Sequence, residues 1–166
     1  MAKGDVRIVD SPYSNAPTYK FQVDNRTTTS DTAIYAGEPV KVYGVETGNY
    51  VYHMANGDPE IGTDIMVGIT ASDSTETSTV NGTVEVYLPL PGIIYRCAAT
   101  TGSNLAVGIL LDTVTFDLTS TTYTIDEDEG SDENVHGLRI VGYDDDADTV
   151  DFIIKPAVTL IDCSIA

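Results

Sequence analysis

The sequence predicts an all-β protein: a small β-barrel or sandwich of about ten to twelve short strands with an extended N-terminal arm. Val, Ile, Thr and Tyr, which favour strands, abound in the 166 residues. Short apolar runs alternate at regular spacing with turn-forming residues. A stiff Pro-Leu-Pro-Gly break joins two such runs. We find no repeat or long linker, so we expect residues 1–30 to form the arm and residues 31–166 a single domain.

The expected arm cannot be a continuous helix, because Pro12 and Pro17 interrupt it. Apolar and polar residues alternate in two places, which predicts short extended segments that could pair with a neighbouring sheet edge. A polar, Thr-rich stretch follows, from residue 25 to residue 32. The residues that we expect to bind a partner are Val6, Arg7, Ile8, Tyr19, Phe21 and Val23.

The stretch from Val84 to Cys97 organises the domain. Apolar residues at Val84, Val86 and Leu88 predict a half-buried strand. Pro89 and Pro91 then remove two backbone donors, and Gly92 allows a positive φ, so the strand must stop there. A second strand begins at Ile93. Arg96 and Cys97 have no evident partner in the sequence.

The other elements are predicted from the same alternation of apolar and polar residues and from turn-forming residues. Residues 33–52 read as a hairpin-like pair, and residues 105–111 fit either a strand or a short helix. We expect surface loops at 71–79 and 126–134, and turns at 56–59 and 144–148. The remaining expected strands are 65–69, 113–118, 121–125, 138–141, 150–154 and 156–161, of which 138–141 and 150–154 form a hairpin.

The net charge of −18 comes from 26 acidic and 8 basic residues. Such a chain repels nucleic acid and anionic membranes, so we expect neither as a partner. Residues 1–30 hold four basic and three acidic residues, whereas residues 112–151 hold thirteen acidic residues and Arg139. The N-terminal segment is therefore the better candidate for docking. No signal sequence or membrane span is expected, which predicts synthesis in a cytoplasm.

The sequence contains no motif typical of a catalytic site or of a cofactor-binding site. Only His53 and His136 could act as imidazole bases, and we interpret His136, beside Gly137, as a surface histidine in a turn. Cys97 and Cys163 lie far apart and are expected to be free thiols. The Asp126 loop lacks the twelfth-position Glu of an EF-hand, although another cation site there stays open. We expect no enzyme activity and no cofactor.

Three segments resemble the core of capsid decoration (cement) proteins of tailed bacteriophages. They are Ala36-Gly37-Glu38-Pro39-Val40, Ile61 to Thr75, and Gly82 to Gly92, so the resemblance covers about residues 33–100. It implies a structural protein on the virion's capsid surface, made in the host bacterial cytoplasm. It also implies binding to the major capsid protein, bridging of neighbouring subunits, and a homotrimer, or alternatively a dimer.

A different class of function stays open at this point. The protein could be a carbohydrate- or receptor-binding β module of a head or tail fibre. In that interpretation, exposed Tyr50, Tyr52 and Tyr123 would form a platform for sugars.

Overall fold

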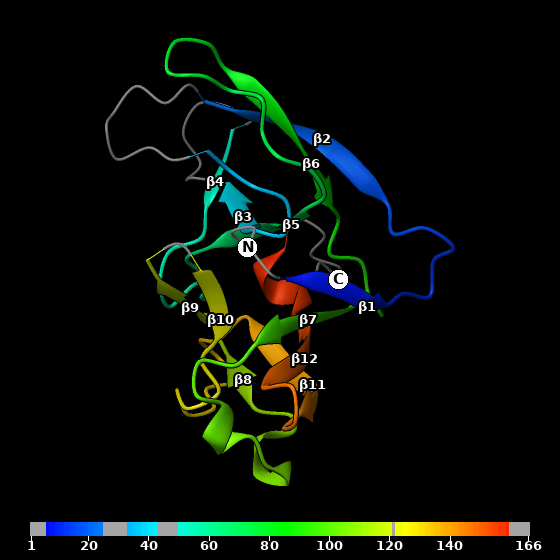
Figure 1. The fold of residues 1–166 in the computed structure, drawn as a ribbon, viewed down its shortest axis with the longest axis vertical. Coiled ribbons are helices and arrows are strands. Elements are labelled where there is room, and N and C mark those ends of the chain that lie inside the picture. Colours follow the sequence, from blue (N-terminus) through cyan, green and yellow to red (C-terminus); the bar gives the residue numbers. More distant parts are fainter. Residues whose placement is uncertain (1–5, 25–32, 43–49, 121, 160–166) are drawn as a thin grey trace.

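The computed structural model describes residues 6–24, 33–42, 50–120 and 122–159. It confirms the predicted fold class: twelve strands form two five-stranded sheets and one two-stranded sheet, and the observed strand pairs within them are antiparallel (Figure 1). In the described part of the chain the sheets stack as a sandwich, without closing into a barrel.

The lower sheet in Figure 1 contains strands from both ends of the chain. Its order is β1 (Arg7–Asp10), β7 (Ile94–Ala98), β12 (Thr149–Ile154), β11 (Leu138–Asp144) and β8 (Thr113–Val114). The β11–β12 hairpin is the one predicted, with its turn at the acidic residues 144–148. Two 3-10 helices, η1 (Gly102–Asn104) and η2 (Val107–Ile109), lie below this sheet in the view. Residues 105–111, for which the sequence fits either a strand or a short helix, thus contain the short helix η2.

The upper sheet curls over itself. Its order is β2 (Thr18–Val23), β6 (Gly82–Tyr87), β5 (Ile65–Thr70), β3 (Pro39–Val42) and β4 (Val51–His53). The curl brings the two outer strands together at one end, where a single bridge joins Gln22 to Tyr50. The β3–β4 pair confirms the hairpin-like pairing predicted for residues 33–52.

Two hydrophobic cores result from this arrangement. The larger core lies between the sheets, and the smaller core lies inside the curl of the upper sheet. Strand β5 separates the cores: Met66 and Ile69 face the larger one, whereas Val67 faces the smaller one. Burial on both faces explains why β5 is a continuous apolar run without polar alternation.

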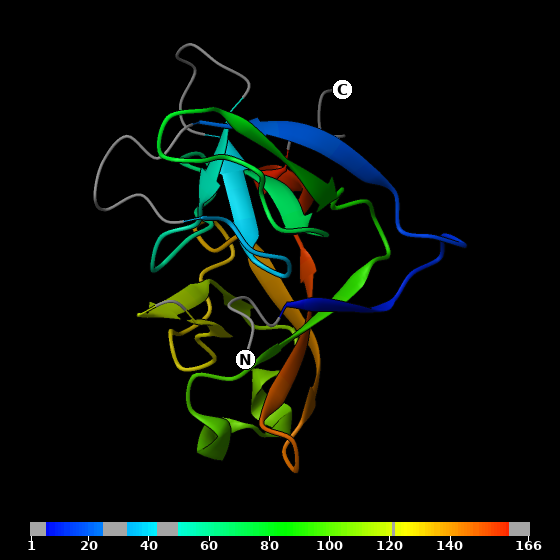
Figure 2. The ribbon, with the colours of Figure 1, turned by 45° about the horizontal axis from the view of Figure 1, so that its top comes forward.

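Two connections cross between the sheets side by side (Figure 2). One runs from β1 to β2 and the other from β6 to β7, and the flanking strands pair with each other. Between them, the Tyr13 hydroxyl donates to the Pro91 carbonyl at 3.3 Å and the Leu88 amide donates to the Pro17 carbonyl at 3.0 Å. Gly92 has the predicted positive φ, +88°. The Pro-Leu-Pro-Gly break is therefore the corner at which the chain changes sheets.

The described residues of the expected arm contribute two strands to the sheets of the domain. Residues 7–10 and 18–23 form the outer strands β1 and β2 of the two sheets. They are extended, as predicted, but hydrogen bonds to β7 and β6 make them part of the sandwich. Residues 1–5 and 25–30 of the expected arm lie outside the described residues.

Two strand predictions are wrong. Residues 113–118 form two strands in different sheets, because the chain leaves the lower sheet after β8 and begins β9 (Phe116–Thr119), which pairs with β10 (Thr122–Ile125). Between them, the Thr115 amide and hydroxyl bind the Glu129 carboxylate. Residues 156–158 form the 3-10 helix η3 (Pro156–Val158), and Thr159 then bridges to Met66. Residues 160 and 161 lie outside the described range.

Candidate functional site

The six residues predicted to bind a partner divide between the interior and the surface. Val6 and Val23 are buried in the larger and the smaller core, at 4% and 6% exposure, so their side chains offer almost no surface to another molecule. This corrects their assignment as binding residues: Val6 lies just before β1 and Val23 ends β2, and both strands pair within the chain and turn these side chains inward. Ile8 and Phe21 are partly buried.

Arg7 and Tyr19 keep the exposure that a binding role needs. Tyr19 is 62% exposed on β2, and its ring packs edge-on against Phe21 with the centroids 5.2 Å apart. Arg7 is exposed on β1, in the other sheet. The surface part of the predicted site is thus two separate side chains beside the crossovers.

A groove follows the first crossover. It has a volume of about 730 Å³, and Val6, Arg7, Ile8, Tyr13, Thr70 and Tyr87 are among its lining residues. Its lining is mixed in polarity and holds one ionisable cation but no acid–base pair. We therefore interpret the groove as better suited to binding an extended segment of another chain than to catalysis.

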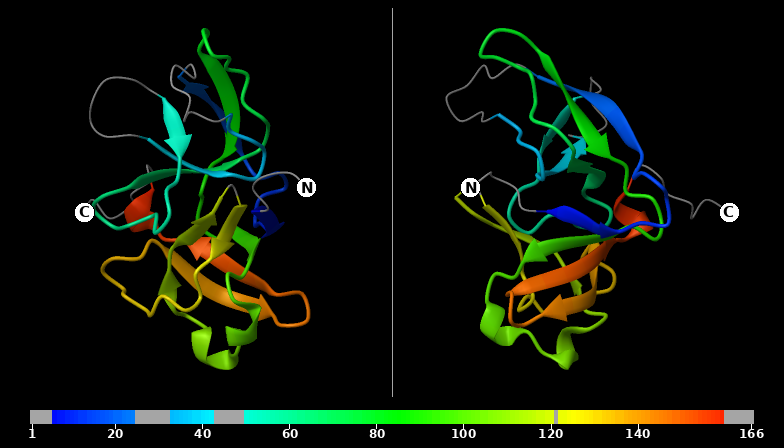
Figure 3. Two further views of the ribbon diagram at one scale, coloured as in Figure 1. Left: turned by 60° about the vertical axis from the view of Figure 1, so that its left-hand side comes forward. Right: turned by 45° about the vertical axis from the view of Figure 1, so that its right-hand side comes forward.

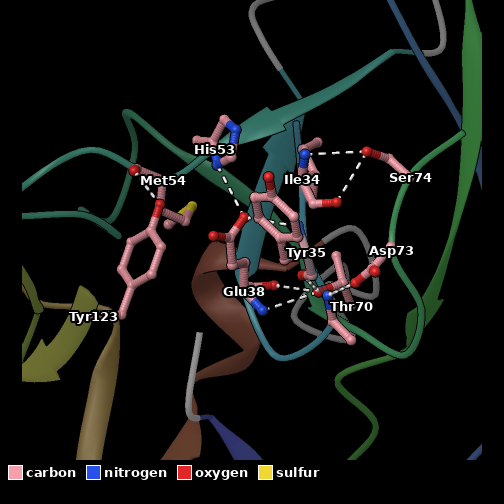
Figure 4. Close-up of polar contacts among 10 residues, drawn as sticks. Ile34, Tyr35, Glu38, His53, Met54, Thr70, Asp73, Ser74 and Tyr123 are labelled. Atoms are coloured by element: carbon pink, nitrogen blue, oxygen red, sulfur yellow. Dashed lines mark hydrogen bonds and ion pairs between the residues drawn. The ribbon is translucent and has the colours of Figure 1, made fainter. Parts of the chain in front are cut away.

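The pair of Glu38 and His53 is the arrangement closest to a catalytic one (Figure 4). The buried Glu38 carboxylate lies 3.3 Å from His53 Nδ1 and accepts a hydrogen bond from the Tyr35 amide at 3.0 Å. A nucleophilic site would need a hydroxyl available to the imidazole. The hydroxyls of Thr70 and Ser74 instead donate to backbone carbonyls, those of Tyr35 and Ile34 respectively. We interpret the cluster as the support of the loop before β3.

A second buried ionic group joins β3 to the loop before β5. The Lys41 ammonium donates to the carboxylates of Asp58 at 2.5 Å and Asp64 at 2.7 Å. Burial lowers the pKa of Lys41, but hydrogen bonds to the two carboxylates outweigh it and raise the pKa overall. Asp58 and Asp64 also accept from the backbone amides of Ala55 and Glu60. These contacts fix the loop geometry.

The prediction that His136 is a surface residue is wrong. Its side chain is buried, and Nδ1 lies 2.8 Å from the Thr113 carbonyl, so Nδ1 must carry the donated proton. Nε2 lies 3.6 Å from the Glu129 carboxylate. The residues around His136 give no sequence signal for its burial, because the Thr113 carbonyl that Nδ1 contacts lies 23 residues earlier in the chain.

The acidic loop at 126–134 turns part of its charge inward. The buried Glu127 carboxylate accepts from the Thr100 and Thr101 amides at 3.0 and 2.8 Å. Glu129 binds Thr115, and Asp132 binds the Asn134 amide. Among the described residues, no group of three or more acids, histidines or cysteines is arranged to hold a metal ion.

Two further residues differ from expectation. Arg96 is not unpartnered: its guanidinium donates to both oxygens of Asp151, at 2.6 and 2.8 Å, across neighbouring strands. The Cys97 thiol is buried and donates to the Tyr123 carbonyl at 3.3 Å, whereas Cys163 lies outside the described residues.

The tyrosine platform predicted for sugars is wrong. Tyr123 is buried in the larger core, where its hydroxyl donates to the Met54 carbonyl at 2.7 Å and burial raises the pKa of the phenol. Tyr52 is exposed on β4, and the hydroxyl of Tyr50 accepts from Asn81. Without Tyr123, the platform of Tyr50, Tyr52 and Tyr123 cannot form.

Comparison with known protein families and with curated proteins gives no match to this chain. In the part of the chain that the structure describes, no helix is long and apolar enough to cross a membrane.

Proposed function

We propose that this protein binds the outer surface of an assembled tailed-bacteriophage capsid and stabilises it by bridging neighbouring major capsid protein subunits. The observation that carries the proposal is the resemblance of residues 33–100 to capsid decoration proteins. The backbone roles of its motif residues support it. Gly37 and Gly92 adopt φ values of +86° and +88°, and the Glu38 carboxylate accepts from the Tyr35 amide in the loop before β3.

A binding role rather than catalysis is supported by the way the buried polar groups are used. Glu38, Lys41 and Glu127 each bind backbone amides or carboxylates that hold loops in place. Charged groups that bind the backbone in this way make the loops, and with them the whole domain, rigid. A rigid body suits a protein that clamps a lattice, because each copy then loses little conformational freedom on binding.

The proposed partner is the major capsid protein, with the decoration protein itself acting as a homotrimer or a dimer. A ligand that binds only the assembled lattice stabilises that lattice by mass action. Several contacts per copy would add avidity. Arg7 and Tyr19, exposed beside the two crossovers, are the N-terminal candidates for one of these contacts.

Sedimentation tests the proposal directly. Purified protein is mixed with heads of its own phage that lack decoration protein, and the heads are pelleted. We expect saturable co-sedimentation and a higher disruption temperature of the heads. Protein that stays in the supernatant at micromolar concentration would contradict the function.

The N-terminal contact needs substitutions rather than a deletion, because β1 and β2 belong to the sheets. In the same assay, Arg7→Glu combined with Tyr19→Ser should weaken binding if this surface contributes. The matched control is Thr18→Ser, an exposed neighbour on β2. Binding equal to that of the wild type would remove Arg7 and Tyr19 from the interface.

A further inference from the structure

Four exposed apolar residues lie on the chain around η2 and on β11. Figures 1 and 3 show these elements at the end of the molecule farthest from the upper sheet. We call the four residues the tip patch. Its residues and their exposed fractions are Val107 74%, Leu110 37%, Leu111 64% and Val141 37%. They come from residues 105–112, which include η2 and which we call the η2 segment, and from β11.

The η2 segment is anchored, so its exposed residues are held in place. Leu105 and Ile109 from the same segment are buried in the larger core. The Leu111 amide donates to the Ile140 carbonyl at 3.0 Å, and the Ile140 amide donates to the Asp112 carbonyl at 2.9 Å. These bonds tie the segment to β11 and place Leu111 beside Val141.

Irregular backbone conformations expose the side chains of Leu111 and Val141. Leu111 has φ of +75°, a conformation that costs a leucine free energy and that persists only where the surroundings enforce it. Val141 is the extra residue of a β-bulge, since Ile140 pairs with Phe152 and Gly142 with the next residue, Asp151. Bulges re-aim side chains. Two adjacent irregularities thus direct apolar groups to one place on the surface.

The surroundings of the tip patch are acidic. Residues 105–112 and 138–151 include six aspartates, of which Asp151 binds Arg96, and one basic residue, Arg139, whose guanidinium binds Glu133. Four of the aspartates lie in or beside the β11–β12 turn, at 144, 145, 146 and 148. A second copy of this chain, with its net charge of −18, would bring like charge to this rim.

We infer that the tip patch docks a basic surface segment of the capsid lattice, one that presents an apolar side chain flanked by lysine or arginine. The inference rests on the proposed function and names the surface that would meet the shell. The apolar centre excludes water, and the aspartate rim selects a positively charged partner. Tyr19 lies on β2, in the sheet at the other end of the molecule (Figure 1), so the two surfaces could reach different subunits.

The test uses the full chain and bare heads. Leu111→Asn removes the apolar group but suits a positive φ, because asparagine tolerates this conformation. It is combined with Val107→Ser, and the matched control is Val80→Ser, 60% exposed in the loop before β6. We expect the double variant to bind about tenfold or more weakly, the scale for loss of buried apolar area. The control should bind like the wild type, and wild-type binding should weaken as NaCl rises.

Each other outcome contradicts the inference in a distinguishable way. If wild type and double variant bind heads equally, the tip patch is not the docking surface, although the proposed function stands. If wild type does not bind, the function and the inference both fail. If the wild type elutes as an oligomer in size-exclusion chromatography and the double variant elutes as a monomer, the patch is a contact between copies instead.

Discussion

Single buried residues decide the irregular parts of this backbone. Lys41 holds two loop carboxylates, Glu127 holds two amides, and Gly68 lets two strands approach closely. The sequence predicted the positive φ of Gly92 because its neighbouring prolines mark a turn. It offered no comparable signal at Gly68 or Lys41, whose partners come from segments distant along the chain.

Gly68 should not tolerate a side chain. A Cβ there would lie 2.0 Å from the Tyr87 carbonyl oxygen, and φ is +147°. We expect Gly68→Ala to reduce the free energy of unfolding by about 3 kcal/mol or more, through clash and strain. Urea denaturation measures it. The control is Gly108→Ala, where a Cβ has open space; equal stability of the two variants would contradict the structure.

Asp64 should make stability depend on acid pH. Burial alone raises the pKa of its carboxyl, but the Glu60 amide and Lys41 outweigh burial and hold the pKa below its usual value. The ionised form therefore stabilises the fold above the unfolded pKa of about 3.9, and this contribution is lost as pH falls through the lower folded pKa.

Asp64→Asn should accordingly lower stability at neutral pH by about 1–3 kcal/mol, the scale for a buried charged group that loses its hydrogen-bond partner. It should also flatten the loss of stability below about pH 4. Urea denaturation at a series of pH values checks both effects. Glu85→Gln, an exposed acid on β6, is the control. A variant with an unchanged acid limb would show that Asp64 is not the group responsible.

Elements with regular alternation were predictable, and elements decided by distant contacts were not. Strands β6, β7, β11 and β12 follow from local apolar spacing and turn residues. The break at Thr115 was not predictable, because it depends on Glu129 in a separate loop. Residues 105–111 were ambiguous for the same reason, since their helix or strand character depends on backbone hydrogen bonds to β11.

The Pro-Leu-Pro-Gly corner should stabilise the fold through its stiffness. Prolines restrict the unfolded chain, so Pro89→Ala combined with Pro91→Ala should cost about 0.4–1 kcal/mol per site. For a chain of this size, this corresponds to a fall in Tm of about 2–6 °C. Differential scanning calorimetry measures it, with Pro156→Ala in η3 as the control for a proline outside the crossover. An unchanged Tm would make the corner incidental to stability.

At the scale of the whole molecule, the N-terminal strands complete both sheets. Sequence alone predicted their extended form but assigned them to an arm, because pairing of residues 7–10 with β7 and of residues 18–23 with β6 is invisible in local patterns. The same burial decides the candidate site: it withdraws Val6 and Val23 from binding and leaves Arg7 and Tyr19.

Deletion of residues 1–24 should therefore destabilise the protein rather than remove a free appendage. It takes away Val6 and Val23 from the two cores and exposes the edges of β6 and β7, which could then pair with other chains. We expect a large drop in Tm and aggregation, measured by calorimetry and light scattering. A monodisperse deletion variant with native Tm would indicate a true arm.

The paired crossovers also set an order of events during synthesis. Strands β1 and β2 are synthesised before their partners β7 and β6, since Arg7 pairs with Arg96 and Val23 with Gly82. Contacts so distant along the chain form late, because loop closure must precede them. The nascent N-terminal segment is thus translated early and incorporated late. The exposed polar side chains of β2 are Thr18, Lys20 and Gln22. They keep the unpaired strand solvated until β6 has been synthesised and pairs with it.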